Sequence, residues 1–414
     1  MKWEKVTLGE ISKNIQTGPF GSQLHQADYS EHGTPVVMPK DLINGRISDE
    51  SIARVNSAHV DRLNRHKIDE GDILYSRRGD VGRCAFASSA EKGWLCGTGC
   101  LRVTVDKTKA VAKFIFYQLQ RAESIGWIEN HAVGSTMLNL NTSILSAIPV
   151  TIPDIQTQTR IASVLSTYDN LIENNQKQIK LLEEAAQRLY QEWFVKLRFP
   201  GHEKVKIVDG VPDGWHICTI DSFLHLYSGF AFKSATFTDD GKYGIVTIKN
   251  VKDGSFDNSS MSRITDIPSN MPIYCHINNG DILLSLTGNI GRVCLAYGEY
   301  NLLNQRVAKI SSQYPGYVYC LFRHKSMFID MQNLANGAAQ QNLSPIRLGK
   351  TKRLFPSDEI LSKFELVITP VLQEILTQFK QIESLKDARD RLLPKLMSGE
   401  IEVSYAKKKP LRHY

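Results

Sequence analysis

Residues Thr157 to Phe194, TQTRIASVLSTYDNLIENNQKQIKLLEEAAQRLYQEWF, contain neither glycine nor proline. A stretch of this length without a helix breaker is typical of one long α-helix. Apolar or small side chains recur along it at alternating steps of three and four, and one polar residue, Asn175, interrupts them. The seam consists of Ile172, Ile179, Leu182, Ala186, Leu189 and Trp193. Because this seam is narrow and apolar, it predicts a partner helix.

The chain contains such a partner 203 residues later. The same steps are occupied there by Ile375, Gln378, Ile382, Leu385, Arg389, Leu392 and Leu396. We expect the two helices to pair as an antiparallel coiled coil, since antiparallel pairing relates the two copies of a tandem repeat by a pseudo-two-fold axis. The residues predicted to make this pairing are Ile172, Ile179, Leu182, Leu189, Ile375, Ile382, Leu385 and Leu392.

The repeat extends well beyond the helices. WEKVTLGEI, from Trp3, aligns with WHICTIDSF, from Trp215, and PVVMPKDLINGRI, from Pro35, aligns with GIVTIKNVKDGSF. GDILYSRRGDVGR, from Gly71, and GDILLSLTGNIGR, from Gly280, are identical at eight of thirteen positions. The offset falls from 212 at the first segment to 203 at GSTMLNLN and GAAQQNLS, so the second copy has lost several loop residues.

We therefore predict an α+β protein, a tandem duplication of a mixed α/β globule followed by a long helix. The expected boundaries are 1–152 and 201–355 for the globules, 153–200 and 356–405 for the helical regions, and 406–414 for a basic tail. Period-two apolar segments predict strands around residues 36–38, 73–75 and 101–103, and a short helix is expected near 112–121. Pro394 predicts a kink or a stop in the second helix.

Composition sets further bounds on the class of protein. Hydrophobic residues make up 42% and charged residues 22% of the 414 positions, as in ordinary folded proteins, and the net charge is +7. No run approaches the roughly 18 apolar residues that a membrane span requires, so we expect no membrane association and a cytoplasmic location. Seven cysteines without paired CxxC spacing indicate buried thiols rather than disulfides or a metal site. His25, His32, His59 and His66 are expected at the surface of polar loops.

Catalytic motifs are missing from the sequence. It has no NPPY or DPPY tetrad, no glycine-rich loop for a methyl-donor cofactor, no GxSxG and no HExxH. We therefore assign no catalytic residue, no metal ligand and no cofactor to this chain. Together with the duplicated architecture, the absence favours binding over catalysis.

The glycine-flanked segment GDILYSRRGDVGR predicts a hairpin whose loop carries Arg77, Arg78 and Arg83. Arginine in such a loop can reach phosphates and the O6 and N7 acceptors of guanine. The second copy keeps the glycines and Arg292 but has Leu286 and Thr287 at the tip, as expected of two readers of different sequences. The alternative is that both loops are solvated turns and that Arg83 and Arg292 form structural salt bridges. The predicted DNA-binding residues are Lys40, Arg77, Arg78, Arg83, Lys249, Asn289 and Arg292.

These motifs, with a long helix ending QEWFVKLRFPG and a second ending RDRLLPKLMSGEI, together resemble the specificity subunit of type I restriction-modification enzymes over essentially the whole chain. The resemblance implies two target recognition domains, each reading half of a split asymmetric site in double-stranded DNA. It also implies two modification subunits that dock on the helices and carry S-adenosylmethionine. Separate restriction subunits would supply the nuclease and the hydrolysis of ATP, with magnesium.

Two other readings remain open at this point. The chain could be a stand-alone regulator with two DNA-reading domains and a rigid spacer, or a self-sufficient methyltransferase or endonuclease. Co-purification of a modification subunit would distinguish a specificity subunit from both alternatives. Methyl transfer or cleavage by the isolated chain would instead indicate an enzyme.

Overall fold

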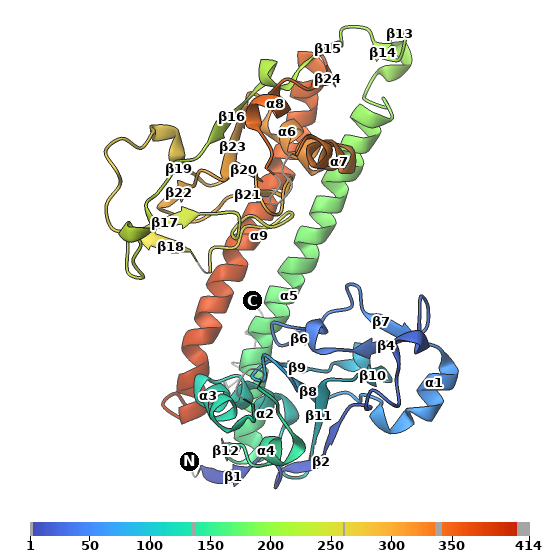
Figure 1. Cartoon of the computed structure of the whole chain (residues 1–414), viewed down its shortest axis with the longest axis vertical. Coiled ribbons are helices and arrows are strands. Elements are labelled where there is room, and N and C mark those ends of the chain that lie inside the picture. The colour runs from blue at the N-terminus through green and yellow to red at the C-terminus, as the bar shows by residue number, and fades with distance from the viewer. Residues whose placement is uncertain (1–2, 135–137, 260, 336–341, 404–414) are drawn as a thin grey trace, which may run out of the picture. The chain divides into compact units, whose positions relative to one another are not determined.

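The computed structural model describes residues 3–134, 138–259, 261–335 and 342–403 (Figure 1). The chain divides into two compact units. The first unit runs to Asn170 and resumes at Asp387, and the second unit is Leu171–Lys386. Each unit thus contains one globule and segments of both long helices. The basic tail and the middle of both GSTMLNLN-like motifs, which are residues 135–137 and 336–341, lie outside the described residues.

The two long helices predicted from sequence are present. Helix α5 (Ile155–Tyr190) continues into a π-helical turn at Gln191–Val195, and helix α9 (Asp358–Ser398) has 41 residues. Of the kink or stop predicted at Pro394, the stop is wrong, because α9 continues past this residue. Leu396 and Met397 in the last turn are buried in the core of the first unit. Burying two such side chains is worth about 1.5–3 kcal/mol each, which offsets the backbone hydrogen bond that proline removes.

Within the second unit, α5 and α9 pair in antiparallel fashion, which confirms the predicted fold class. Trp193, late in α5, packs edge-on against Phe364, early in α9, with ring centroids 5.5 Å apart. Earlier in α5, Asn175 Nδ2 donates to Gln381 Oε1 at 3.1 Å. The predicted pairing residues Ile172, Ile179, Ile375 and Ile382 are buried in one core, with Leu182, Leu189 and Leu385 half-buried against it.

The first unit repeats this helix pairing with its own segments. Arg389 Nη1 donates to Asp169 Oδ1 at 2.8 Å, and Ile161 and Leu165 share a core with Leu396. Leu392 is half-buried against the same core. Early residues of α5 thus meet late residues of α9, so the direction of pairing is again antiparallel.

In the globule of the first unit, one sheet has the strand order β2-β11-β8-β9 and the other β10-β4-β7-β3, while β1 pairs with β12. The strands predicted around 36–38, 73–75 and 101–103 are β4, β8 and β11, and the predicted short helix is α2. The elements are β1 (Glu4–Thr7), β2 (Ser12–Thr17), β3 (Tyr29–Ser30), β4 (Thr34–Val37), β5 (Leu42–Ile43), β6 (Arg46–Ile47), β7 (Ala53–Val55), α1 (Ser57–Arg62), β8 (Ile73–Ser76), β9 (Cys84–Phe86), β10 (Leu95–Cys96), β11 (Cys100–Val105), α2 (Ala112–Leu119), α3 (Ala122–His131), α4 (Thr142–Ser146) and β12 (Pro149–Ile152).

The globule of the second unit has the equivalent main sheet, β16-β23-β20-β21, beside a sheet of order β18-β17-β22-β19, and β15 pairs with β24. The repeat found in the sequence is therefore a repeat of the fold. The elements are β13 (Ile207–Val208), β14 (Val211–Pro212), β15 (His216–Thr219), β16 (Leu224–Ser228), β17 (Tyr243–Val246), β18 (Ser262–Ile264), β19 (His276–Ile277), β20 (Ile282–Ser285), β21 (Val293–Leu295), β22 (Asn301–Leu303), β23 (Val307–Ser312), α6 (Pro315–Arg323), α7 (Lys325–Leu334), α8 (Pro345–Gly349) and β24 (Lys352–Phe355).

One histidine expected at the surface is buried. His66 has an exposed fraction of 3%, and its Nε2 accepts a hydrogen bond from Arg65 Nε at 2.9 Å. Burial, reinforced by the charges of Arg65 and Arg102, lowers the pKa of His66 from 6.5 to about 4. The sequence pattern did not predict the burial of His66, because packing within the first globule, and not local polarity, decides it.

The lowered pKa of His66 predicts loss of stability in mild acid. Below pH 6.5 the unfolded chain binds the proton more tightly than the folded one, so stability present at neutral pH is lost as pH falls from 6.5 toward 4. The loss amounts to at most about 3 kcal/mol. Denaturant unfolding between pH 7 and 4 should show a shallower pH dependence for His66→Asn than for the wild type. His32→Asn, at an exposed site, is the control and should leave the slope unchanged.

Helix pairing in the second unit predicts a contrast between two residues of α9. Ile375 is fully buried, whereas the side chain of Leu366 is 78% exposed. Ile375→Ala should lower the free energy of unfolding by about 2–5 kcal/mol, and Leu366→Ala should change it by no more than about 0.5 kcal/mol. Equal shifts in the denaturation midpoints of the two variants would contradict the pairing.

Candidate functional site

The predicted hairpin is formed by β8 and β9, which pair antiparallel with Ile73 opposite Phe86. The backbone of its loop is held by two neighbouring segments. Arg77 N donates to Gly99 O at 2.8 Å, Leu140 N donates to Arg77 O at 2.8 Å, and Gly79 N donates to Leu138 O at 3.1 Å. The hairpin tip, the turn before β11 and the segment before α4 therefore meet at one place.

A fourth segment, the loop after β2, packs backbone against backbone there. Gly18 N donates to Cys100 O at 2.9 Å, and a Cβ atom at Gly18 would lie 2.0 Å from the carbonyl oxygen of Gly97. A Cβ at Gly99 would lie 3.3 Å from Pro39, which places the loop after β4 beside the same turn. We define the first loop cluster as residues 18–20, 38–40, 77–80, 97–99 and 138–140.

The predicted DNA-binding residues of the first unit differ in the contacts that their cationic groups make. The Arg77 guanidinium lies 5.9 Å from the ring centroid of Phe20, whose side chain is 54% exposed. Arg78 is exposed and forms no ion pair with any described residue. Lys40 is exposed, and its Nζ donates to Ser51 O at 3.1 Å. Arg83 forms an ion pair with Asp80 at 2.9 Å, so the structural salt bridge left open for Arg83 is present.

The second unit builds a loop cluster on the same backbone pattern. Leu286 N donates to Arg306 O at 3.0 Å and Leu343 N donates to Leu286 O at 2.8 Å, which are the counterparts of the bonds at Arg77. A Cβ at Gly229 would lie 2.3 Å from Asn304 O, which repeats the close approach between Gly18 and the carbonyl oxygen of Gly97 in the first unit. We define the second loop cluster as residues 229–230, 247–249, 286–291, 304–306 and 342–343.

The side chains of the two clusters differ. Lys249 and Asn289 are exposed, and Arg292 is half-buried. Thr287 Oγ1 donates to Asn342 Oδ1 at 3.1 Å, so these side chains satisfy one another. In the first cluster, by contrast, three buried polar atoms have no hydrogen-bond partner among the described residues: Arg77 Nε, Thr98 Oγ1 and Asn139 Oδ1. Each such atom costs about 1–3 kcal/mol unless an added group satisfies it.

Sequence reasoning missed several members of these clusters. Phe20, Thr98, Asn139 and Arg306 come from segments that are remote from the hairpins in sequence. For Asn139 a signal existed, because the repeat aligns it with Asn342 at the offset of 203. For Arg306 there was none, since its counterpart in the first copy, which the equivalent backbone hydrogen bonds identify, is Gly99.

Neither cluster offers the apparatus of a metal or nucleophilic centre. Within the described ranges no group of three His, Cys, Asp or Glu residues could hold a metal ion. Six of the seven cysteines are buried and Cys218 is half-buried. Burial raises the pKa of the Cys84 thiol to about 12, which keeps it protonated at neutral pH. None of the helices within the described ranges is both long and apolar enough to cross a membrane.

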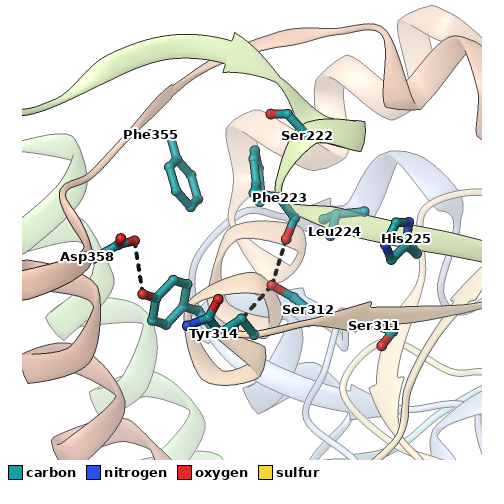
Figure 2. A pocket seen from close by; sticks show the side chains of 10 residues that line it. Ser222, Phe223, Leu224, His225, Ser311, Ser312, Tyr314, Phe355 and Asp358 are labelled. Carbon is teal, nitrogen blue, oxygen red and sulfur yellow. Dashed lines mark hydrogen bonds between the residues drawn. The ribbon is translucent and has the colours of Figure 1, made fainter.

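A cavity of about 420 Å³ lies apart from the second loop cluster, between the start of β16, the end of β23 and the first turn of α9 (Figure 2). Phe223 and Phe355 stack at its edge with ring centroids 4.4 Å apart. Tyr314 donates its hydroxyl to Asp358 Oδ1 at 2.9 Å, and Ser312 Oγ donates to Phe223 O at 2.9 Å. Burial, followed by the hydrogen bond to Asp358, raises the pKa of Tyr314, so the phenol stays a donor.

Comparison with known proteins gives a consistent result. The family model described as type I restriction modification DNA specificity domain matches residues 1–184 and 212–387. The specificity subunit of the type I restriction enzyme MjaIX of Methanocaldococcus jannaschii is 27% identical over 384 residues, covering 89% of this chain and 87% of that protein. The HindI specificity subunit of Haemophilus influenzae is 22% identical over 471 residues, covering 96% and 99%. The crystal structure of the S subunit of a type I restriction-modification system from M. genitalium has a TM-score of 0.59 at 19% identity, covering 96% of each chain.

The close approach at Gly18 yields a test of the first loop cluster. Gly18→Ala forces a Cβ against the carbonyl oxygen of Gly97, and overpacking of this kind costs about 1–3 kcal/mol. Gly21→Ala is the matched control, because a Cβ there meets nothing within 4 Å. Hydrogen exchange of the amides of residues 97–100 should accelerate in the first variant and stay unchanged in the second. Equal exchange in both would mean that the two loops do not touch.

Proposed function

Because the chain belongs to the type I restriction-modification DNA specificity family, we propose that it is the sequence-specificity subunit of a type I restriction-modification complex and that each globule reads one half of a bipartite site. The observation that carries this proposal is the pair of loop clusters. Both use the same backbone hydrogen bonds, at Arg77 in the first and at Leu286 in the second, yet they present different side chains. A common scaffold with different tips supports the reading of two different half-sites.

The chemistry of the first loop cluster supports contact with DNA. Lys40 and Arg78 are exposed cations that can neutralise phosphates, and these contacts give affinity without sequence information. The amide of Asn139 can pair with adenine N6 and N7 in the major groove, and the guanidinium of Arg77 with guanine O6 and N7. Such contacts would satisfy the polar groups that have no hydrogen-bond partner among the described residues.

The second loop cluster offers a different set of groups. Lys249 and Arg306 are exposed cations, and Asn289 and Gln305 add exposed amides. Asn342 is already engaged by Thr287, so the reading groups differ from those of the first unit. A different base sequence in the second half-site follows from this difference.

The catalytic steps belong to partners in this proposal. Two modification subunits carrying S-adenosylmethionine dock on the paired helices, and restriction subunits supply ATP hydrolysis and magnesium-dependent cleavage. A hollow of about 460 Å³ on the helix pair of the second unit supports the docking, and the exposed Leu171 and the half-buried Leu385 are among the residues that line it. Leu366 and Val367 add exposed apolar surface on α9.

The decisive experiment exchanges one globule. Asp209 to Phe355 is replaced by the corresponding segment of a relative with a known different site, and methylation is mapped across a genome that expresses the hybrid with its modification subunit. One half-site should change and the other should persist. Loss of both half-sites in a hybrid that still folds would mean that the globules read DNA jointly, and a wild-type map without a split site would overturn the proposed function.

Loss of one exposed cation should weaken DNA binding in a salt-dependent way. Arg78→Ala should lower affinity for the cognate site and reduce the slope of log affinity against log salt by about one unit, the value for one phosphate contact. Lys177→Ala on α5 removes the same charge from an exposed site paired with Glu173 and is the control. Identical slopes for the two variants in the assembled complex would remove Arg78 from the interface.

A further inference from the structure

We propose that the cavity beside the first turn of α9 in the second unit binds a lysine-bearing loop of a partner protein. The two repeats differ at this position, since the first repeat fills it with its own chain. The proposal rests on the proposed function only through the choice of partner in the test.

The two repeats are equivalent on either side of this position. In the first unit Val105 pairs with Ser12 at the end of the β2–β11 ladder, and in the second unit Ser312 pairs with Leu224 at the end of the β16–β23 ladder. The helices that follow, α2 and α6, begin at positions 203 apart, Ala112 and Pro315. Six residues, 106–111, connect strand and helix in the first unit, but only Gln313 and Tyr314 do so in the second. The second connection is therefore four residues shorter.

In the first unit this connection folds over the end of the sheet. Asp106 N donates to Ile11 O at 2.9 Å, and Lys109 Nζ donates to Glu10 O at 2.8 Å. Ala110 is buried, and Val111 N donates to Gln158 Oε1 at 2.8 Å. The connection thus places Lys109 and Ala110 over this position, with the Lys109 ammonium group held by a backbone carbonyl.

In the second unit the corresponding residues line an open cavity. The counterparts of Glu10 and Ile11 are Ser222 and Phe223, and both line the 420 Å³ space (Figure 2). The missing residues of the connection are therefore the reason for the cavity. The first repeat fills this position with a segment of its own chain. In the second repeat either another molecule or solvent must fill it.

The lining of the cavity favours a cation. Asp358 adds an exposed carboxylate to the lining, and the stacked rings of Phe223 and Phe355 line the same cavity. An ammonium group gains from a carboxylate, from backbone carbonyls and from ring faces. His225 is the basic side chain in the lining, and Lys350 is already paired with Asp221 at 2.8 Å. A DNA phosphate would meet the Asp358 carboxylate, so the lining disfavours nucleic acid as the occupant.

A photo-crosslinker placed at Gln313 tests the occupant directly. In the complex assembled with its modification subunits and DNA, Gln313→p-benzoylphenylalanine should crosslink to one lysine-containing peptide of a partner subunit. The same residue introduced at exposed Lys107, in the filled connection of the first repeat, is the control and should not capture that peptide. Crosslinks to DNA, crosslinks confined to this chain, or the same peptide captured from both positions would overturn the inference.

Filling the cavity from within is the second test. The segment 106–111 is grafted in place of Gln313 and Tyr314, and Asp358→Asn is made separately, because an amide still accepts the Tyr314 hydrogen bond but lacks the charge. Both variants should keep the thermal unfolding midpoint and DNA binding of the isolated chain, and both should bind the modification subunit at least tenfold more weakly. Wild-type affinity in Asp358→Asn and in a folded graft would refute the cavity as a binding site. A wild-type chain that assembles no complex on DNA would instead refute the proposed function.

Discussion

The antiparallel contact between α5 and α9 is the interaction on which the rest of the structure depends. In the second unit it joins Trp193 to Phe364 and Asn175 to Gln381, and in the first unit it joins Asp169 to Arg389. Each globule packs on one segment of α5 and one segment of α9, so neither core is complete without this pairing. The helix seam is apolar enough to associate, and the buried Asn175 and Gln378 are repeat counterparts that place polar groups at equivalent steps. Asn175 donates to Gln381 of the other helix, and a buried polar residue paired in this way restricts register, because other alignments would leave it without that partner.

A rigid scaffold explains how one fold can present two different surfaces. The loop clusters are held by backbone hydrogen bonds and by glycines that allow carbonyl groups to approach closely, as at Gly18 and Gly229. Backbone bonds do not depend on side-chain identity, so the tips can change while the loops stay in place. Arg77 and Arg78 in one copy and Leu286 and Thr287 in the other occupy the same backbone positions.

The cavity near Asp358 reflects a difference in loop length between the two copies of the repeat. The connection that is four residues shorter leaves the ladder and the following helix in place but lacks the chain segment that covers them in the other copy. The two halves of the molecule are therefore not interchangeable, although their folds match. A difference in loop length, rather than in any catalytic residue, gives the second half a surface that the first lacks.

The sequence by itself determined the duplication, the long helices, the direction of their pairing and the main strands, because apolar periodicity and a repeat offset are local, countable properties. It also located the hairpins that carry Arg77, Arg78 and Arg292. Only the tertiary structure decided that Arg83 is paired with Asp80, that His66 is buried, and that α9 continues through Pro394. It alone brought Phe20, Thr98 and Asn139 to the hairpin tip, since contacts between segments tens of residues apart depend on how the sheets pack, and no local pattern encodes that packing.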